Sequence, residues 1–344
     1  MKKVLAMLLA AMMVISMAAC TGTAPAATEA PATTAAAAEA TTEAPAADTQ
    51  AAKTYTVGIC QLVQHPALDA ATEGFKAAIT EALGDAVTFS EQNASGESTN
   101  CATIINGFVS SNVDLILANA TAPLQAAASA TSTIPVLGTA VTDYASALEI
   151  DNWTGTVGTN VSGTSDLAPL DQQAAMLQEL FPDAKTVGLL YCSAESNSKY
   201  QVDVIRGYLE SAGLTCTDYA FTDTNDVASV AQKAADDSDV IYIPTDNTAA
   251  ANTEAIANVV IPAKTPVIAG EEGICSGCGV ATLSISYYDL GYATGKMAVK
   301  ILTGEADVST MPVEYAPQVT KKYNAANCEA LGVTVPDGYV AIEG

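Results

Sequence analysis

Positive charge is scarce in this sequence of 344 residues. Lysine and arginine together number 13, against 38 aspartates and glutamates, and with one histidine and a single arginine the formal net charge is −25. Surfaces that bind nucleic acid neutralise phosphates with lysine and arginine, so nucleic acid is excluded as a partner. After the signal-like start of the chain, no apolar run reaches the roughly 18 residues that a membrane helix needs. We therefore expect the bulk of the chain to lie outside the membrane.

The groups that enzymes use as nucleophiles and bases are equally scarce. His65 is the sole histidine, and it precedes a proline at an expected helix start, where it serves either as a structural residue or as a ligand contact. The sequence contains no G-x-S-x-G turn and no phosphate-binding G-x-x-x-x-G-K motif. We therefore expect no catalytic residue and no cofactor. A surface hydrolase is the alternative from a different class of protein.

Eight cysteines include Cys275 and Cys278 in a C-x-x-C arrangement. A structural zinc site would need a second pair of ligands at similar spacing, which the sequence lacks, so we predict no metal. Two states of these cysteines stay open at this point. They form either a local disulfide or free thiols that pack as small apolar groups.

Residues 1–20 have the pattern of a secretory signal peptide. Lys2 and Lys3 precede an apolar run at residues 4–15, and small residues then lead to Cys20. Residues 16–20 resemble the lipobox of bacterial lipoproteins, in which the cysteine becomes the diacylated first residue of the mature chain. We predict lipidation at Cys20. The alternative is an ordinary cleavage site followed by a chance cysteine.

Residues 21–53 are predicted to form a disordered tether. Up to residue 52 the composition is almost wholly alanine, threonine, proline and glutamate, without aromatic or large aliphatic side chains. Such a segment cannot bury enough apolar surface to offset the entropy lost on ordering. A helix is the alternative because alanine favours helices, but Pro25, Pro31 and Pro45 interrupt it.

Beyond the tether, short β-rich runs alternate with helical stretches, which is typical of parallel sheets covered by helices on both faces. We predict an α/β protein of two doubly wound parallel-sheet lobes. Between them, a glycine-rich segment at residues 151–165 is expected to act as a hinge. The expected strands are 57–60, 87–89, 114–118, 135–137, 186–191, 215–221, 240–243 and 266–269, and the expected helices are 66–83, 98–109, one from 121, 166–180, 198–212, 226–236, 248–259 and 287–302.

In doubly wound sheets, ligands bind outside the carboxyl ends of the strands. Strand ends in the first half are small or neutral and include Thr121 and Thr139, whereas those in the second half carry Glu195, Asp246 and Glu271. A donor-rich wall facing an acidic wall suits a ligand with a carboxylate at one end and an ammonium at the other. An α-amino acid is the simplest such ligand. The competing interpretation is that strand-end Asp, Ser and Thr cap the helices that follow.

The carboxylate of such a ligand would rest on exposed backbone N–H groups at helix starts and on the hydroxyls of Thr121 and Thr139. The single arginine, Arg206, lies inside an expected helix. We therefore expect no guanidinium clamp on the ligand.

Seven segments of the folded part carry a resemblance to a known family. In chain order they are HPALD from His65, GTAVTD from Gly138, NVSGTSD from Asn160, LLYCSAESNS from Leu189, IYIPTDN from Ile241, VIAGEEG from Val267 and YYDLGYATGKMAVKILTGE from Tyr287. These segments resemble the solute-binding-protein family of ABC importers whose members take up tryptophan or tyrosine. The resemblance implies a type I periplasmic-binding-protein fold whose lobes are joined by a three-segment hinge. It assigns residues 54–160 and about 286–316 to an N-lobe, and residues 161–285 and about 317–344 to a C-lobe.

The resemblance also implies a function. It indicates an extracytoplasmic, membrane-anchored lipoprotein that closes on an α-amino acid, with tryptophan, tyrosine and phenylalanine as candidates, and delivers it to a permease. Its partners would be the amino acid, the permease and ATPase subunits and, through the lipid anchor only, the membrane. We expect a monomer. The alternative is a protein of the same fold that binds another small solute, such as a sugar or nucleoside.

The candidate ligand site combines strand-end residues with residues that the resemblance implies. By the resemblance Glu195, Asn197 and Asp246 belong to the site, with Gln61 and the turn at residues 138–140 opposite them. The complete set of candidates is Gln61, His65, Thr121, Thr139, Ala140, Tyr191, Glu195, Ser196, Asn197, Asp246 and Glu271.

Overall fold

The computed structural model of the protein describes residues 53–316 and 318–343. The predictions for the signal peptide, for lipidation at Cys20 and for the tether up to residue 52 fall outside these residues. Among the helices of the described part, none combines the length and the apolar character needed to cross a membrane.

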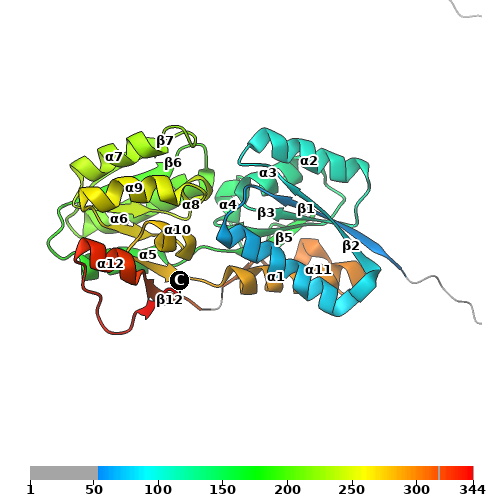
Figure 1. The fold of residues 1–344 in the computed structure, drawn as a ribbon. Coiled ribbons are helices and arrows are strands. Elements are labelled where there is room, and N and C mark those ends of the chain that lie inside the picture. Colours follow the sequence, from blue (N-terminus) through cyan, green and yellow to red (C-terminus); the bar gives the residue numbers. More distant parts are fainter. Residues whose placement is uncertain (1–52, 317, 344) are drawn as a thin grey trace, which may run out of the picture. The chain divides into compact units, whose positions relative to one another are not determined.

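The first sheet, which with its helices we call the N-lobe, has six parallel strands in the order β11-β5-β4-β3-β1-β2. Figure 1 labels β1, β2, β3 and β5 of this sheet. Both faces are covered. Ile116 packs in the apolar layer shared with α2 and α3, whereas its neighbours Leu115 and Leu117 pack in the layer shared with α1 and α11. The elements are β1 (Tyr55–Gln61), α1 (Pro66–Leu83), β2 (Val87–Asn93), α2 (Ser98–Ser110), β3 (Leu115–Asn119), α3 (Thr121–Ala130), β4 (Val136–Val141), α4 (Tyr144–Ala147), β5 (Val161–Ser165), α11 (Tyr287–Thr303) and β11 (Glu314–Tyr315), with 3-10 turns at Gly84–Ala86 and Val308–Thr310.

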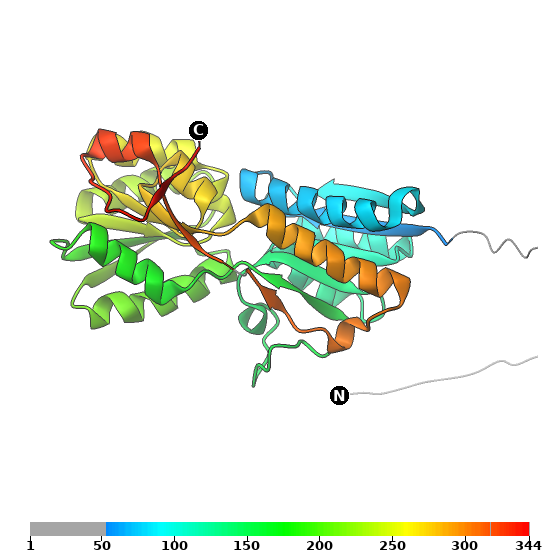
Figure 2. The same cartoon turned by 90° about the horizontal axis from the view of Figure 1, so that it is seen from below.

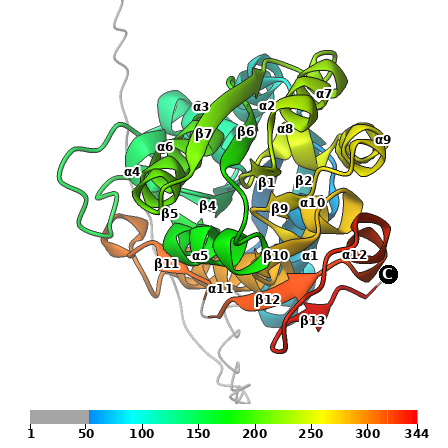
Figure 3. The same cartoon turned by 90° about the vertical axis from the view of Figure 1, so that its left-hand side faces the viewer.

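The second sheet, the C-lobe, has seven strands in the order β13-β12-β10-β9-β8-β6-β7. Only the pairing of β10 with β12 is antiparallel in this sheet. Helices α5 and α6 cover one face and α7 and α9 the other (Figure 3). The elements are α5 (Leu170–Leu180), β6 (Thr186–Cys192), α6 (Ser196–Ser211), β7 (Thr215–Phe221), α7 (Val227–Asp237), β8 (Val240–Ile243), α8 (Asn247–Ala250), α9 (Thr253–Ala263), β9 (Val267–Ala269), α10 (Glu272–Gly277), β10 (Ala281–Ser284), β12 (Thr320–Tyr323), α12 (Ala325–Leu331) and β13 (Val340–Ala341).

The chain passes between the two lobes three times. The first connection, residues 166–169, follows β5; the second, residues 285–286, follows β10; and the third links β11 to β12. The predicted fold of two doubly wound lobes joined by three segments is therefore confirmed.

The hinge expected at residues 151–165 is wrong in position. Residues 161–165 form β5 and pair with β4, and Trp153 packs against the N-lobe core. Gly163 has a positive φ of +145°, and a Cβ there would lie 2.1 Å from the carbonyl oxygen of Gly138. The glycine is needed for close packing of two strands. The change of lobe assigned to residue 160 comes after β5 instead, so residues 161–165 belong to the N-lobe sheet.

Three other predicted elements differ from the structure. The helix expected from residue 166 begins at Leu170, because Pro169 precedes it and the residue before a proline avoids the helical conformation. The helix expected at 248–259 is divided into α8 and α9. Residues 138–140 are not a turn but the irregular end of β4, where the register with β5 shifts and Ala140 has a φ of +51°.

The seven cysteines in the described part of the chain are free thiols, and all but Cys216 are buried. The local disulfide considered for Cys275 and Cys278 is therefore not formed in this structure. These side chains pack as small apolar groups; both belong to the C-lobe layer beneath α9 and α10.

Helix α11 returns to the N-lobe after the second connection and packs against α1 with almost no space between the backbones (Figure 2). A Cβ added to Gly74 of α1 would lie 2.0 Å from the carbonyl oxygen of Tyr288. One added to Gly291 of α11 would lie 1.9 Å from the carbonyl oxygen of Ala71. Glycine on both helices thus allows the contact that holds the returning segment in place.

We expect Gly291→Ala to lower the free energy of unfolding by about 1–3 kcal/mol or more, because the added methyl group overpacks the contact. Gly207→Ala on α6 is the matched control, since nothing lies within 4 Å of a Cβ at this exposed helical glycine. That change should stabilise the protein by about 0.5–1 kcal/mol. Urea denaturation followed by circular dichroism measures both. Equal effects of the two substitutions would contradict the tight contact.

Candidate functional site

The carboxyl ends of strands from both sheets form the candidate site. A cleft of about 310 Å³ is lined by the loops after β1, β2 and β3 of the N-lobe and after β6, β7 and β8 of the C-lobe. Polar side-chain contacts cross between the lobes at this cleft. His65 Nε2 lies 3.3 Å from Asn247 Oδ1, and Gln125 Nε2 lies 3.5 Å from the hydroxyl of Ser196.

Glu195, at the end of the β6 loop, binds the start of α8. Its Oε1 accepts hydrogen bonds from the backbone N–H and the hydroxyl of Thr248, both at 2.8 Å. Its Oε2 accepts from the backbone N–H of Asn247 at 3.0 Å and from the side-chain amide of Asn247 at 2.7 Å. The carboxylate therefore caps a helix that lies more than fifty residues further along the sequence.

Asp246 and Glu271 are also caps. Asp246 is buried, and its two oxygens accept from the backbone N–H groups of Ala249 at 2.8 Å and Cys192 at 2.6 Å. Burial and the nearby Glu195 raise the pKa of Asp246 to about 8, an effect that the two backbone amides oppose. Glu271 accepts from the first amides of α10, and burial raises its pKa to about 7. The capping interpretation thus describes the hydrogen bonds of Glu271 and the bond from Ala249 to Asp246, whereas the bond from Cys192 joins Asp246 to the end of β6.

His65 is buried, and its hydrogen bonding defines its tautomer. The side-chain amide of Asn247 donates to Glu195, which leaves Asn247 Oδ1 as the acceptor that faces the imidazole. His65 Nε2 therefore donates, and in a neutral ring Nδ1 is an acceptor. Within the described residues, Nδ1 has no hydrogen-bond partner. Burial lowers the pKa of His65, which favours the neutral ring, although the contact with Asn247 opposes this shift.

The other N-lobe candidates lie in different surroundings. Thr121 begins α3 and lines the cleft. The hydroxyl of Thr139 is buried 3.3 Å from that of Thr164, beneath the end of β4. Ala140 is buried at the irregular end of the same strand. Gln61 donates to Asp69 at 2.6 Å, accepts from a threonine of α1, and lines a separate hollow of the N-lobe.

The remaining C-lobe candidates also lie in different surroundings: some line the cleft and others do not. Asn197 and Ser196, at the start of α6, line the cleft, and Asn197 Nδ2 donates to the carbonyl oxygen of Thr245 at 3.1 Å. Tyr191 instead packs in the C-lobe layer beneath α5 and α6. Glu271 lines a different hollow, beside the start of α11. Among the candidates, the cleft is lined by Thr121, Glu195, Ser196 and Asn197. His65 does not line it but contacts Asn247, which was not a candidate and does.

Asp166 was not among the candidates, although it lies at the carboxyl end of β5. Its side chain is buried, with a relative exposure of 3%. Oδ2 accepts a hydrogen bond from the Tyr287 hydroxyl at 2.9 Å, whereas Oδ1 has no partner within the described residues. Burial raises the pKa of Asp166 to about 6. Its position at a strand end, inside the quoted segment NVSGTSD, was the signal that could have revealed it.

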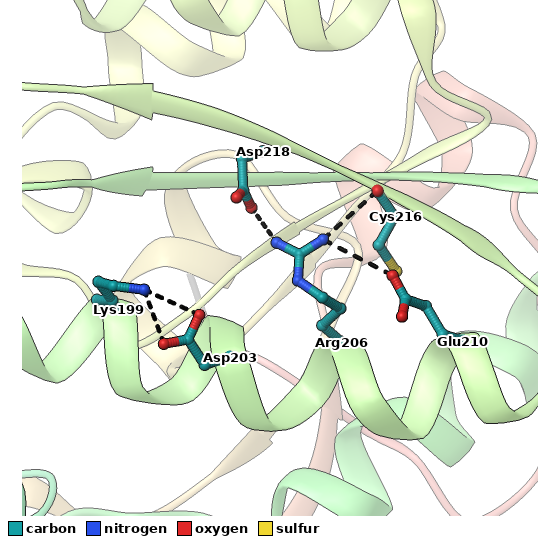
Figure 4. Close-up of polar contacts among 6 residues, drawn as sticks. All are labelled: Lys199, Asp203, Arg206, Glu210, Cys216 and Asp218. Carbon is teal, nitrogen blue, oxygen red and sulfur yellow. Dashed lines mark hydrogen bonds and ion pairs between the residues drawn. The ribbon is translucent and has the colours of Figure 1, made fainter.

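The single arginine lies away from the site. Arg206 is on α6, as expected, and it pairs with Asp218 of β7 and with Glu210 one turn further along the helix (Figure 4). The guanidinium also donates to the carbonyl oxygen of Cys216 at 3.4 Å. These contacts occupy the arginine on the outer side of the C-lobe sheet.

Comparisons with known proteins agree on the kind of molecule. Residues 56–342 match the model of the family described as ABC transporter substrate binding protein. A tyrosine-binding protein of Clostridioides difficile (strain R20291) is 35% identical over 268 residues, which cover 77% of each chain.

Two solved structures are similar throughout the folded part. The ABC domain in complex with L-Trp from Streptococcus pneumonia is 33% identical, with a TM-score of 0.80 over 84% of this chain and 100% of that one. The ligand-free, open structure of a substrate binding protein with adhesive properties from Clostridium difficile is 37% identical, with a TM-score of 0.64 and the same coverage. The structure is thus more similar to the L-Trp complex, although the sequence is slightly closer to the open protein.

We expect Glu195→Gln to lower the free energy of unfolding by about 1–3 kcal/mol, because an amide nitrogen would replace an oxygen that accepts from backbone N–H groups and would leave a donor unsatisfied. Glu210→Gln, near the end of α6, is the control, since its carboxylate is half-exposed and 3.9 Å from Arg206. That change should stay within about 0.5 kcal/mol. Chemical denaturation checks both values, and an unaltered stability of Glu195→Gln would exclude the capping role.

Proposed function

Because the chain belongs to the ABC transporter substrate binding protein family, we propose that it captures an aromatic amino acid between its lobes and delivers it to an ABC permease. Tryptophan, tyrosine and phenylalanine are the candidate ligands. The observation that carries the proposal is the cleft at the strand ends, where groups from both lobes meet at the His65–Asn247 contact. The tyrosine-binding relative and the similarity to an L-Trp complex support the choice of ligand.

The cleft has the size and chemistry for a small polar ligand. Its volume of about 310 Å³ is at the lower end of the range for small-molecule sites. Leu62, Val63 and Ala122 offer apolar surface for a side chain, and Thr121 at the start of α3 offers a hydroxyl beside exposed backbone N–H groups. We propose that the carboxylate of the ligand lies at this helix start, where the helix dipole favours negative charge.

Binding would be coupled to closure of the lobes. A ligand that contacts both lobes favours the closed state by the contacts that only this state offers. The greater similarity to the L-Trp complex than to the open, ligand-free protein supports a closed arrangement for the structure described above. Opening of the lobes would break the contact between His65 and Asn247, which crosses the cleft.

We also propose that the protein is an extracytoplasmic lipoprotein, held at the membrane through Cys20. The support is the sequence of residues 1–20, with its basic start, apolar run and small residues before the cysteine. In this arrangement the protein binds its ligand without turnover and acts as a monomer. It delivers the ligand to the permease, and the ATPase subunits are the further partners in the importer. A tether at residues 21–53 would let the folded part reorient while it stays near the membrane.

We expect L-tryptophan, L-tyrosine or L-phenylalanine to raise the melting temperature of the purified protein by several degrees. A ligand at 100 times its Kd stabilises the native state by about 2.7 kcal/mol. Thermal-shift measurements with the twenty amino acids, common sugars and nucleosides test this, and D-tryptophan is the control for stereospecific binding. Stabilisation by sugars or nucleosides alone would refute the amino-acid function and support the alternative solute.

We expect Cys20→Ala to abolish incorporation of a labelled fatty acid and to release the protein from the membrane fraction, because no other residue would carry the anchor. Cys216→Ala, which changes a cysteine of the folded part, is the control and should keep the label. Metabolic labelling followed by cell fractionation measures both. An unlabelled wild-type protein would contradict lipidation.

A further inference from the structure

Four buried or half-buried acids lie at the strand ends that face the other lobe, and they differ in what they bind. Both oxygens of Glu195, Asp246 and Glu271 accept hydrogen bonds from groups at the start of α8 or α10 or, in one case, from Cys192. Asp166 is the exception, because its Oδ1 has no hydrogen-bond partner in the described part of the protein. Buried carboxylate oxygens in native proteins nearly always have one.

In the part of the chain that the structure describes, no cation lies against the Asp166 carboxylate. The ionisable groups that face Asp166 are the phenol of Tyr287 on α11, the phenol of Tyr144 on α4 and the carboxylate of Glu271 before α10. These groups are neutral or negatively charged at pH 7, so an ionised Asp166 lies in negative surroundings. Removing such a charge from water is costly unless it is paired.

Asp166 does not line the cleft, and its partner Tyr287 lines the hollow beside the start of α11; a chain of contacts links these two residues to the cleft wall. Asp166 follows β5 directly and begins the first connection between the lobes, while Tyr287 follows the second connection. The hydroxyl of Thr245, at the end of β8, lies close enough to the Tyr287 phenol to influence its pKa. The carbonyl oxygen of Thr245 in turn accepts from Asn197, which lines the cleft. Asp166 therefore lies at the sheet edge where doubly wound proteins bind ligands.

We propose that Asp166 Oδ1 accepts the α-ammonium group of the amino-acid ligand, with the Tyr287 hydroxyl holding the other carboxylate oxygen in place. The proposal rests on the amino-acid function proposed above and adds the residue that recognises the ligand's positive charge. An ammonium group offers three N–H donors and a full positive charge, which is what an unpaired buried carboxylate lacks. From the sequence, we expected Glu195 and Asp246 to bind the ammonium group. The proposal instead gives this role to Asp166, in the first connection between the lobes.

The test compares two ligands that differ only in this group. L-tryptophan carries the ammonium, and L-indole-3-lactic acid has a hydroxyl in its place; L-tyrosine and 4-hydroxyphenyllactic acid form a second pair. Isothermal titration calorimetry at pH 7.5 gives the affinities. We expect Asp166→Asn to weaken amino-acid binding by about 10- to 150-fold, the range for loss of a hydrogen bond to a charged group, and to change hydroxy-acid binding little.

Asp114→Asn is the matched control. Asp114 accepts from the backbone N–H of Thr56 at the opposite edge of the N-lobe sheet, so both ligands should bind as to the wild type. Ligand-free Asp166→Asn should melt at the same or a higher temperature than the wild type, because it removes an unpaired buried charge. If it fails to fold, Tyr287→Phe replaces it, with an expected loss of several-fold in amino-acid affinity only.

The outcomes separate the two proposals. If wild-type protein binds no aromatic amino acid, the proposed function fails. If the wild type binds L-tryptophan or L-tyrosine but Asp166→Asn weakens the amino acid and the hydroxy acid equally, or weakens neither, the role of Asp166 is refuted. A loss confined to the amino acid supports it.

Discussion

A carboxylate that is removed from water needs hydrogen-bond donors or a counter-ion, and this requirement organises the facing edges of the two sheets. In the C-lobe, the first backbone N–H groups of short helices supply these donors. Glu195 and Asp246 together bind the start of α8, and Glu271 binds the start of α10. Cations are used elsewhere, as where Arg206 pairs with Asp218 on the outer side of the C-lobe. Of these acids Glu195 lines the cleft, and its carboxylate already accepts hydrogen bonds from the first backbone N–H groups of α8.

Much of the fold could be predicted because its signals are local. Pro66 in the first turn and Gly84 after the last residue delimit α1 at the predicted bounds, and β7 and β8 also have the predicted bounds. The hinge was misplaced because a glycine has two uses. Gly163 could have provided flexibility, but it permits the approach of the Gly138 carbonyl, and only the partner strand decides between these uses. The short helix α10 has too few residues to show a periodic pattern.

The site could be predicted less completely than the fold. The sequence located the strand ends, but it could not tell a capping acid from a binding acid, because the amides that bind Glu195 are more than fifty residues away along the chain. Tyr191 does not line the cleft, because successive strand residues point to opposite faces: Tyr191 faces the layer beneath α5 and α6, whereas Leu190 faces the other layer. Asp166 was assigned to a helix, so its free oxygen was not considered.

The composition of the chain gives the site its selectivity in the proposed mechanism. The single arginine pairs with Asp218 of β7, and within the described residues no lysine or arginine acts on Asp166, so the protein does not neutralise this carboxylate itself. A ligand that fills the cleft without a positive charge would leave this buried carboxylate unpaired, and a site is most selective where the wrong ligand leaves its polar groups unsatisfied. Asp166 begins the first connection between the lobes and Tyr287 follows the second. An ammonium group bound to Asp166 would therefore hold both connections in one geometry. Charge recognition and lobe closure would then draw on the same interaction, so the free energy of closure would depend on the ligand's ammonium group.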